Sequence, residues 1–249
     1  MSNSLIVSVH IHKNAGMNFK KHLVKVFDGS LSLSYGRDER ILERFFTKIH
    51  VPKYKESDFD NIAIIHGHFL TDLFDFLEKD IKYAIFLRDP VERVISNYYF
   101  FKRNNFKNSH ICTMIAEGLG LEEYAELNSS QNVQSFFLAN KPIECFDFVG
   151  VCEEYEKSVL LFDRLFNVKG SMINSLKYYK QCIASIFNKK NELAMPDSLT
   201  NNKNPEKQTT IYDISNRLRD KIIGINLLDY DLYKKGNSHF RINCEKFHV

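Results

Sequence analysis

The sequence contains no long hydrophobic run, and no stretch approaches the roughly 18 apolar residues that a membrane-spanning helix requires. Its first residues, MSNSLIVSVHIHKNAG, also lack the basic start and the long apolar core of a secretory signal. Internal repeats and low-complexity tracts are absent as well. We therefore expect a cytoplasmic protein that has no membrane span.

Neither sign of charge dominates the chain. It carries 34 lysines and arginines against 31 acidic residues, which gives a net charge of +3 with the histidines neutral. Proteins that bind nucleic acid usually concentrate basic residues on one face, so we expect no nucleic-acid partner. The balance is compatible with a local basic pocket that binds a small anionic ligand.

Cysteine is scarce, and its pattern excludes two common roles. The five cysteines are an odd number, and none belongs to a CxxC pair. This spacing predicts neither a disulfide framework nor a zinc site. We expect free thiols, which are typical of a reducing compartment, and no bound metal. The five residues are Cys112, Cys145, Cys152, Cys182 and Cys244.

The remaining composition is that of an ordinary globular protein. Hydrophobic residues make up 44% of the 249 residues and charged residues 26%, values that are usual for a soluble domain. A chain of this length forms one large domain or, at most, two small ones. We expect a single domain over residues 1–249.

Short apolar segments alternate with helical patterns along the chain. Runs rich in β-branched and aromatic residues predict buried strands at 5–12, 62–65, 83–87 and 146–151. Apolar residues at helical spacing predict helices at 19–27, 90–103, 154–166 and 211–235. This alternation is typical of an α/β fold with a central parallel β-sheet flanked by helices. Ligands of such folds bind at the carboxyl ends of the strands.

Two further segments each allow two interpretations. The polar segment 189–210 is either a loop that closes over a ligand with Lys203 or Lys207, or a surface loop with solvated lysines. The aromatic run Tyr98, Tyr99, Phe100 and Phe101 either lines a cleft or packs in the core, where large apolar side chains are more often found.

The first candidate site is the turn of residues 13–18, Lys13-Asn14-Ala15-Gly16-Met17-Asn18, which joins the first strand to a helix. Free backbone N–H groups and the positive end of the helix dipole make such a turn a natural anion site. Gly16 lets the backbone approach a phosphate closely, and Lys13 supplies a positive charge. The turn is not a Walker A loop, because the GxxxxGK[ST] pattern is absent. A plain surface turn is the alternative.

The second candidate site combines Arg88 with Ser96. Arg88 follows a predicted strand, just before a helix that Asp89 caps and Pro90 begins. The planar guanidinium group suits phosphate, and the serine hydroxyl adds a further hydrogen-bond donor. The alternative is an arginine that pairs with Asp89 or Glu92, and a serine on the helix surface.

The third candidate site is His66-Gly67-His68, at the end of another predicted strand. A neutral imidazole can take a proton from a hydroxyl nucleophile. Two ligands on one strand do not make a metal site. His10 and His12 form a second such pair, for which we favour a supporting role beside the turn that follows them.

Together these segments resemble the PAPS-dependent sulfotransferases that include the heparan sulfate 2-O- and 6-O-sulfotransferases and bacterial relatives. PAPS is 3′-phosphoadenosine-5′-phosphosulfate. The family's HIPKTGGTS loop, which binds the 5′-phosphosulfate, corresponds to HIHKNAGMN at residues 10–18. Its arginine and serine for the 3′-phosphate correspond to Arg88 and Ser96 in LRDPVERVISNYYFF. Its HGH segment corresponds to IIHGHF, which implies that His68 is the catalytic base and that His66 assists.

The resemblance extends over nearly the whole chain. Residues 132–138 resemble an N-x-Q-[ST]-x-x-L segment, residues 146–162 an FxFVGxxExxxxSxxLL stretch, and residues 225–236 a closing N-x-x-D-x-x-L-Y segment. The chain departs from the family where His12 replaces a proline, and where Met17 and Asn18 replace a Thr-Ser pair that contacts the 5′-phosphate.

The resemblance implies a P-loop-like sulfotransferase fold and a complete reaction. A sulfuryl group passes from PAPS to a hydroxyl of a carbohydrate-like acceptor, PAP is the second product, and no metal is required. The implied catalytic residues are His68, Lys13 and His66. The implied donor-binding residues are Lys13, Asn14, Ala15, Gly16, Met17, Asn18, Arg88 and Ser96. A kinase-like nucleotide-binding protein and a non-catalytic binding protein on the same fold are the alternatives.

Overall fold

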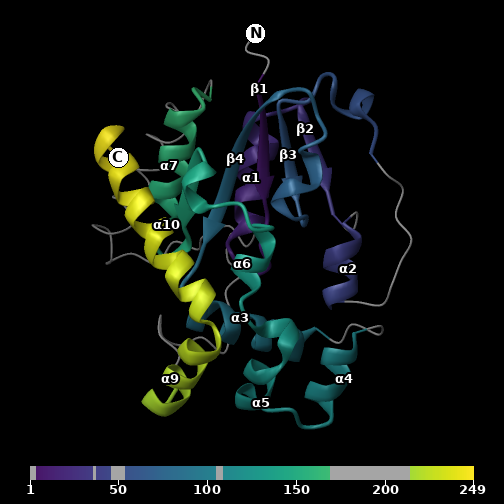
Figure 1. Cartoon of the computed structure of the whole chain (residues 1–249), viewed down its shortest axis with the longest axis vertical. Coiled ribbons are helices and arrows are strands. Elements are labelled where there is room, and N and C mark those ends of the chain that lie inside the picture. The colour runs from purple at the N-terminus through teal and green to yellow at the C-terminus, as the bar shows by residue number, and fades with distance from the viewer. Residues whose placement is uncertain (1–3, 36–37, 46–53, 105–108, 169–213) are drawn as a thin grey trace, which may run out of the picture.

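The computed structural model describes residues 4–35, 38–45, 54–104, 109–168 and 214–249. Five parallel strands form one sheet in the order β2-β3-β1-β4-β5 (Figure 1). The strands are β1 (Ser4–Val9), β2 (Leu31–Ser34), β3 (Ile64–Gly67), β4 (Asp80–Leu87) and β5 (Phe148–Val151). The predicted α/β fold with a central parallel sheet flanked by helices is therefore confirmed.

The strand order changes direction between β1 and β4. The chain leaves β1 toward β2, on one side of the sheet, whereas it leaves β4 toward β5 on the other side. Ligands of α/β proteins bind at the carboxyl ends of two neighbouring parallel strands whose connections diverge in this way. The turn after β1 and the arginine after β4 both lie at this point.

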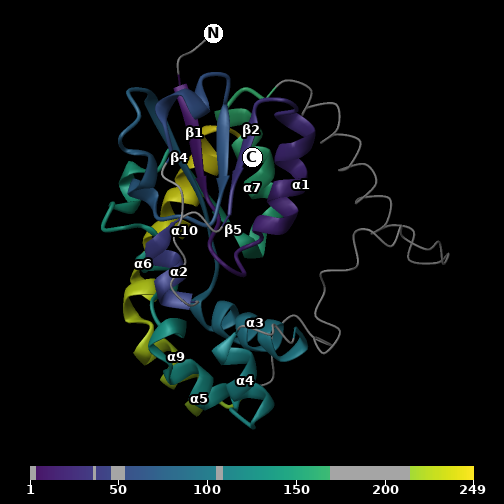
Figure 2. The ribbon, with the colours of Figure 1, turned by 90° about the vertical axis from the view of Figure 1, so that its right-hand side faces the viewer.

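Helices cover both faces of the sheet and the end where the strands finish. The longer helices are α1 (Gly16–Val26), α3 (Pro90–Arg103), α7 (Tyr155–Leu165), α9 (Asn216–Ile225) and α10 (Leu227–Lys246). The shorter ones are α2 (Glu39–Phe45), α4 (His110–Ala116), α5 (Leu121–Glu126) and α6 (Val133–Phe137). In Figure 2, α3, α4, α5 and α9 lie together beyond the carboxyl ends of the strands.

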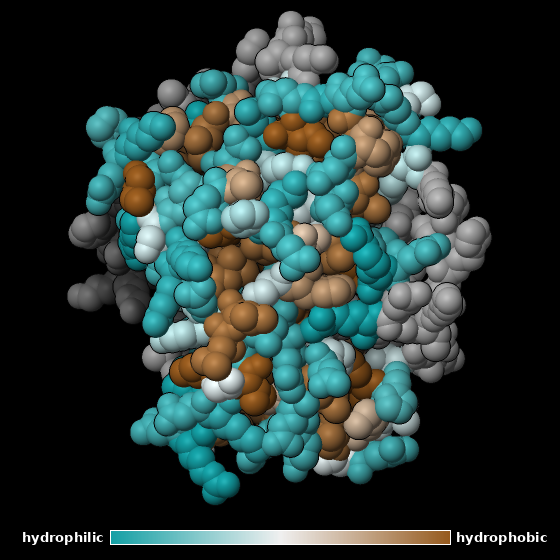
Figure 3. All heavy atoms as spheres, in the orientation of Figure 1, coloured by the Kyte–Doolittle hydropathy of each residue, from teal (hydrophilic) through white to brown (hydrophobic). Residues whose placement is uncertain are grey.

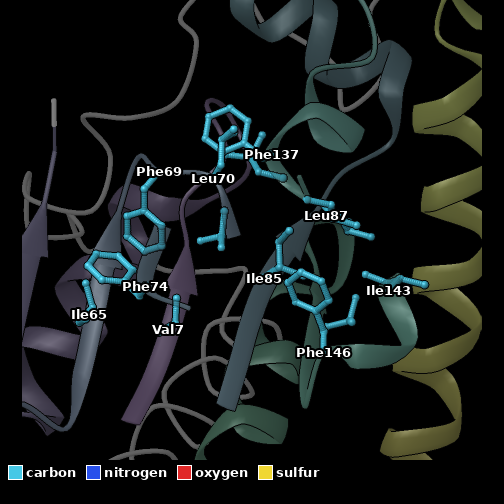
Figure 4. Packing of buried hydrophobic residues seen from close by; sticks show 14 of the residues in the cluster. Val7, Ile65, Phe69, Leu70, Phe74, Ile85, Leu87, Phe137, Ile143 and Phe146 are labelled. Atoms are coloured by element: carbon cyan, nitrogen blue, oxygen red, sulfur yellow. The ribbon is translucent and has the colours of Figure 1, made fainter. Parts of the chain in front are cut away.

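Two buried clusters sandwich the sheet. On one face, Phe69, Phe74 and Phe137 pack against the strands (Figure 4). On the other face, Phe19 of α1 and Phe162 of α7 pack against side chains that alternate with the first set along the strands. Side chains of a strand point to opposite faces in turn, which is why nearly continuous apolar runs build a sheet buried on both sides.

A third buried cluster belongs to the helices beyond the sheet. Val91, Val94 and Tyr98 of α3 pack there against Tyr124 of α5 and Ile222 of α9. Over the face seen in Figure 3, hydrophilic residues dominate, and hydrophobic residues show between them in small groups. Among the described helices, none combines the length and the apolar character needed to cross a bilayer.

The boundaries of several predicted elements need correction. The first strand ends at Val9 rather than residue 12, so His10 and His12 lie in the following turn. The strand predicted at 62–65 is Ile64–Gly67, and that at 146–151 is Phe148–Val151. The strand predicted at 83–87 begins earlier, at Asp80. Strand ends depend on pairing with neighbouring strands, which a local apolar run does not specify.

Larger differences involve whole elements, and the short helices α2, α4, α5 and α6 were not predicted. The short edge strand β2 was not predicted, because its four residues alternate too briefly to give a signal. The helical pattern at 211–235 is two helices, α9 and α10, and the second continues to Lys246. They are separated at Asn226, whose side chain accepts a hydrogen bond from the backbone N–H of Asn132, 2.9 Å away.

Other predictions agree closely with the structure. The helix predicted at 90–103 is α3, with the Asp89 carboxylate accepting a hydrogen bond from the Glu92 backbone N–H at 3.0 Å.

The segment 189–210, with Lys203 and Lys207, lies outside the described residues. Cys112, Cys145, Cys152 and Cys244 carry free thiols, whereas Cys182 lies outside the described residues.

Candidate active site

The turn after β1 adopts an unusual backbone conformation. Lys13 and Ala15 have left-handed φ angles of 69° and 58°, which cost non-glycine residues about 1 kcal/mol each. Helix α1 begins at Gly16, and no side chain caps its first turn. The turn therefore presents the positive end of a helix dipole, which attracts anions.

Gly16 is required by a close packing contact. A Cβ atom at this position would lie 1.8 Å from Cδ2 of the His10 ring, far inside contact distance. The His10 imidazole thus occupies the space that any other residue at position 16 would fill. This contact ties the first helical turn to the histidines described below.

Asn14 holds the turn against the sheet. Its buried side chain donates hydrogen bonds to the carbonyl of Phe86 in β4, at 2.9 Å, and to Oε1 of Gln134, at 2.7 Å. Its backbone N–H donates to the carbonyl of Ile11 at 3.2 Å. The side-chain amide and the backbone N–H of Asn14, a residue that the family resemblance implies binds the donor, are therefore both engaged within the protein.

Arg88 reaches the same turn from the end of β4. It follows β4, and Nη1 donates a hydrogen bond to the carbonyl of Lys13 at 3.0 Å. Nη2 lies 4.0 Å from Oε2 of Glu92, so the alternative pairing with that carboxylate is present as a long contact. Ser96 is half-buried four residues after Glu92, which places the two on one face of α3.

Lys13 lies over an aromatic ring within this basic region. Its Nζ is 4.3 Å from the centroid of Phe100. Burial, with smaller contributions from Arg88 and Arg103, lowers the pKa of Lys13 to about 8. Of the aromatic run on α3, Phe100 thus faces the site, whereas Tyr98, Tyr99 and Phe101 pack in the helical cluster.

Four histidine rings form a stack at the carboxyl ends of β1 and β3. The His68 ring lies between His10 and His12, with centroid distances of 4.2 and 4.0 Å. His66 stacks on the far side of His10 at 5.2 Å and is buried. The sequence suggested the two pairs separately, and the parallel pairing of β1 with β3 brings them together.

Hydrogen bonds distinguish the two histidines of the HGH segment. Nδ1 of His68 lies 2.6 Å from the carbonyl oxygen of His10. A carbonyl only accepts, so Nδ1 carries the proton and Nε2 of His68 has the lone pair. His66 lies deeper, with Nδ1 3.0 Å from the hydroxyl of Ser8. His68 therefore has the tautomer that a proton acceptor needs.

The stacked histidines are neutral at pH 7. Burial is the main cause that lowers the pKa of each ring, to about 3 for His66 and about 4 for His68. For His10 and His12 the pKa is also well below the usual value, because of burial and then the neighbouring His68. Binding of an anion nearby would raise these pKa values.

Tyr35 is a site residue that the sequence analysis missed. Its hydroxyl lies 3.0 Å from Nδ1 of His10, and its ring meets His68 edge-on at 4.9 Å. Burial raises the pKa of Tyr35 to about 12, so the phenol stays protonated. Tyr35 directly follows β2. Recognising residues 31–34 as a strand would have pointed to Tyr35, because side chains that follow parallel strands lie at the same end of the sheet.

The described part of the chain contains no group of three or more histidine, cysteine, aspartate or glutamate side chains placed to hold a metal ion. The histidine rings lie face to face in the stack, with interplanar angles between 12° and 32°. Metal-binding histidines instead aim ring nitrogens at one point. The arrangement suits proton transfer beside an anion site.

Comparison with known proteins identifies the family. A model described as "Sulfotransferase family" matches residues 2–236 of the chain. A solved structure, the crystal structure of a sulfotransferase from Alicyclobacillus acidocaldarius, aligns over 97% of this chain and 99% of that one, with 13% identity and a TM-score of 0.44. No curated protein matches this chain. Because the family model spans nearly the whole sequence, this protein belongs to the sulfotransferase family.

Proposed function

We propose that this protein uses PAPS to sulfate a hydroxyl group of a carbohydrate-like acceptor, with residues 1–249 acting as one catalytic domain. The observation that carries the proposal is that three elements meet at the carboxyl ends of neighbouring strands. The turn after β1, Arg88 after β4 and His68 after β3 come from separate parts of the sequence. They supply a 5′-phosphosulfate site, a 3′-phosphate site and a base.

The donor is bound by two groups of residues in this proposal. The first turn of α1, with Gly16, Met17 and Asn18, receives the 5′-phosphosulfate at the positive helix end, and Lys13 adds a charge. Arg88 and Ser96 bind the 3′-phosphate. Met17 is exposed and contributes no side-chain hydrogen bond, so its backbone N–H replaces the hydroxyl contact found in relatives. Asn14 supports the turn from within.

The transfer proceeds in one step. The acceptor hydroxyl oxygen attacks sulfur, the bond between sulfur and the bridging oxygen breaks, and its electron pair stays on the 5′-phosphate of PAP. Nε2 of His68 takes the proton of the attacking hydroxyl. Lys13 stabilises the charge that develops on the departing phosphate. The buried ring of His66 stacks on the His10 ring and so helps to hold the other histidines in position.

The first test is the binding of PAP, which is 3′,5′-ADP, by calorimetry. We expect PAP to bind far more tightly than 5′-AMP. Arg88→Ala should raise Kd for PAP by about 10- to 100-fold, because charge-assisted hydrogen bonds are lost. Arg217→Ala, an exposed position on α9, serves as the matched control and should change nothing. Equal binding of PAP and 5′-AMP by the natural protein would sink the proposal.

Lys13 should set the alkaline limit of activity. Because its pKa is lowered to about 8 by burial, the free enzyme loses this positive charge as the pH rises above 8. We expect kcat/KM for sulfate transfer to a desulfated glycan pool to fall there, since kcat/KM reports ionisations of the free enzyme. In Lys13→Arg the decrease in kcat/KM should begin at a higher pH, because arginine stays charged. If kcat/KM of Lys13→Arg falls at the same pH as in the natural protein, a group other than Lys13 is responsible for the decrease.

A further inference from the structure

The side chain of Gln134 joins the two halves of the proposed donor site. Gln134 lies in α6 and is fully buried. Its Oε1 accepts hydrogen bonds from the backbone N–H of Arg88, at 2.9 Å, and from Nδ2 of Asn14, at 2.7 Å. Its Nε2 donates to the backbone carbonyl of Arg88 at 2.9 Å. One carboxamide therefore holds Arg88 on both sides of its backbone, together with the turn after β1.

These contacts form a closed circuit. Asn14 of the turn binds Gln134, Gln134 binds the backbone of Arg88, and the guanidinium group of Arg88 returns to the carbonyl of Lys13 at 3.0 Å. Asn14 also donates to the carbonyl of Phe86, two residues before Arg88. The position of the guanidinium group relative to the turn is thus fixed from both ends.

Gln134 is itself anchored to the far end of the chain. Its backbone N–H donates to Oδ2 of Asp229 at 3.0 Å, and the backbone and hydroxyl of Ser135 donate to Oδ1 at 2.7 and 2.9 Å. Asp229 is fully buried in the first turn of α10. Asn132 accepts from the backbone N–H groups of Leu228 and Asp229. The backbone that carries the carboxamide is therefore anchored by residues of the protein itself.

We propose that Gln134 is a positioning residue that makes the two phosphate groups of the donor bind cooperatively. This inference rests on the proposed function and deepens it. When two sites are held in a fixed relation, binding of one end of a ligand makes binding of the other end intramolecular. If the two sites lose their fixed relation, the binding of a nucleotide that carries both phosphates weakens far more than the binding of a nucleotide that carries one.

The test compares three nucleotides in the natural protein and in Gln134→Met, which keeps the length of the side chain and removes its hydrogen bonds. Calorimetry would measure Kd for 3′,5′-ADP, 5′-AMP and 3′-AMP. We expect 3′,5′-ADP to weaken by about 10- to 100-fold, whereas each monophosphate weakens by less than about 3-fold. Damage that is merely structural would weaken all three nucleotides by the same factor.

Two further variants sharpen the test. Gln131→Leu is the matched control, because this glutamine lies nearby but its side chain bonds the carbonyl of Glu126 instead; all three Kd values should stay unchanged. Asn14→Ala breaks the same circuit from the turn and stands in if Gln134→Met fails to fold. Combined with Gln134→Met, it should add little further loss, because both changes remove one interaction unit.

The outcomes separate this inference from the proposed function. If the natural protein shows no preference for 3′,5′-ADP over 5′-AMP, the proposed donor site fails and the role of Gln134 fails with it. If that preference exists and Gln134→Met weakens all three nucleotides equally, or none of them, only the positioning role is overturned. A selective loss for 3′,5′-ADP in both Gln134→Met and Asn14→Ala supports it.

Discussion

His68→Ala should lower the turnover number for sulfate transfer by about 10²- to 10⁴-fold, the usual contribution of a general base. The loss follows from the tautomer that the structure imposes, because the hydrogen bond from Nδ1 to the carbonyl of His10 leaves the Nε2 lone pair to accept a proton. Transfer of labelled sulfate from PAPS to a pool of desulfated glycans would measure the rate.

Donor binding provides the necessary comparison for this variant. Since His68 contacts the acceptor rather than the nucleotide in the proposed mechanism, Kd for 3′,5′-ADP should change by less than about 3-fold, which corresponds to about 0.65 kcal/mol. His22→Ala is the matched control, because His22 on α1 pairs with Asp163 on α7 at 2.7 Å and is not part of the stack; its rate should stay normal. A normal rate in His68→Ala would place the base elsewhere.

The stacked histidines should make the fold sensitive to acid. In the unfolded chain each imidazole has a pKa near 6.5, whereas burial lowers the pKa of His66 to about 3 and that of His68 to about 4 in the folded protein. The unfolded state therefore binds more protons as the pH falls below 6.5. The contribution of the neutral histidines to the free energy of unfolding is fully present above pH 6.5 and is lost progressively as the pH falls toward 4.

The expected effect is large because four rings act together. His10 and His12 also have a pKa well below the usual value, from burial and from neighbouring groups that include His68 and Lys13. Proton linkage then predicts a loss of about 2 kcal/mol between pH 6.5 and 5.5 from His66 and His68, and His10 and His12 add to it in the same direction. That is a large share of the 5–15 kcal/mol, in order of magnitude, by which most domains are stable.

Urea unfolding at pH 7.5, 6.5 and 5.5 would measure this loss. His66→Phe keeps a ring in the stack and removes one titrating group, so the free energy of unfolding should decrease by about 1 kcal/mol less between pH 6.5 and 5.5. His110→Gln, at an exposed position of α4, should leave the slope unchanged. A free energy of unfolding that stays constant from pH 7.5 to 5.5 would contradict the prediction.

Local patterns in the sequence determined the parts of the fold that depend on neighbours along the chain. The apolar run before Lys13, the glycine after it and the helical spacing from Phe19 specify a strand, a turn and a helix. Asp89 and Pro90 mark the start of α3, because a cap and a first-turn proline act within a few residues. The family motifs around Lys13, Arg88 and His68 likewise need only short stretches of sequence.

The tertiary structure decided which of these residues meet. Parallel pairing of β1 with β3 turns two histidine pairs, 56 residues apart in sequence from His10 to His66, into one stack, and edge strand β2 adds Tyr35 to it. Gln134 contacts Asn14 across 120 positions and Arg88 across 46. No local period encodes such distances, because they depend on strand order and on the packing of α6 against α10. The sequence alone thus determined the chemical groups, and only the packed sheet determined their geometry.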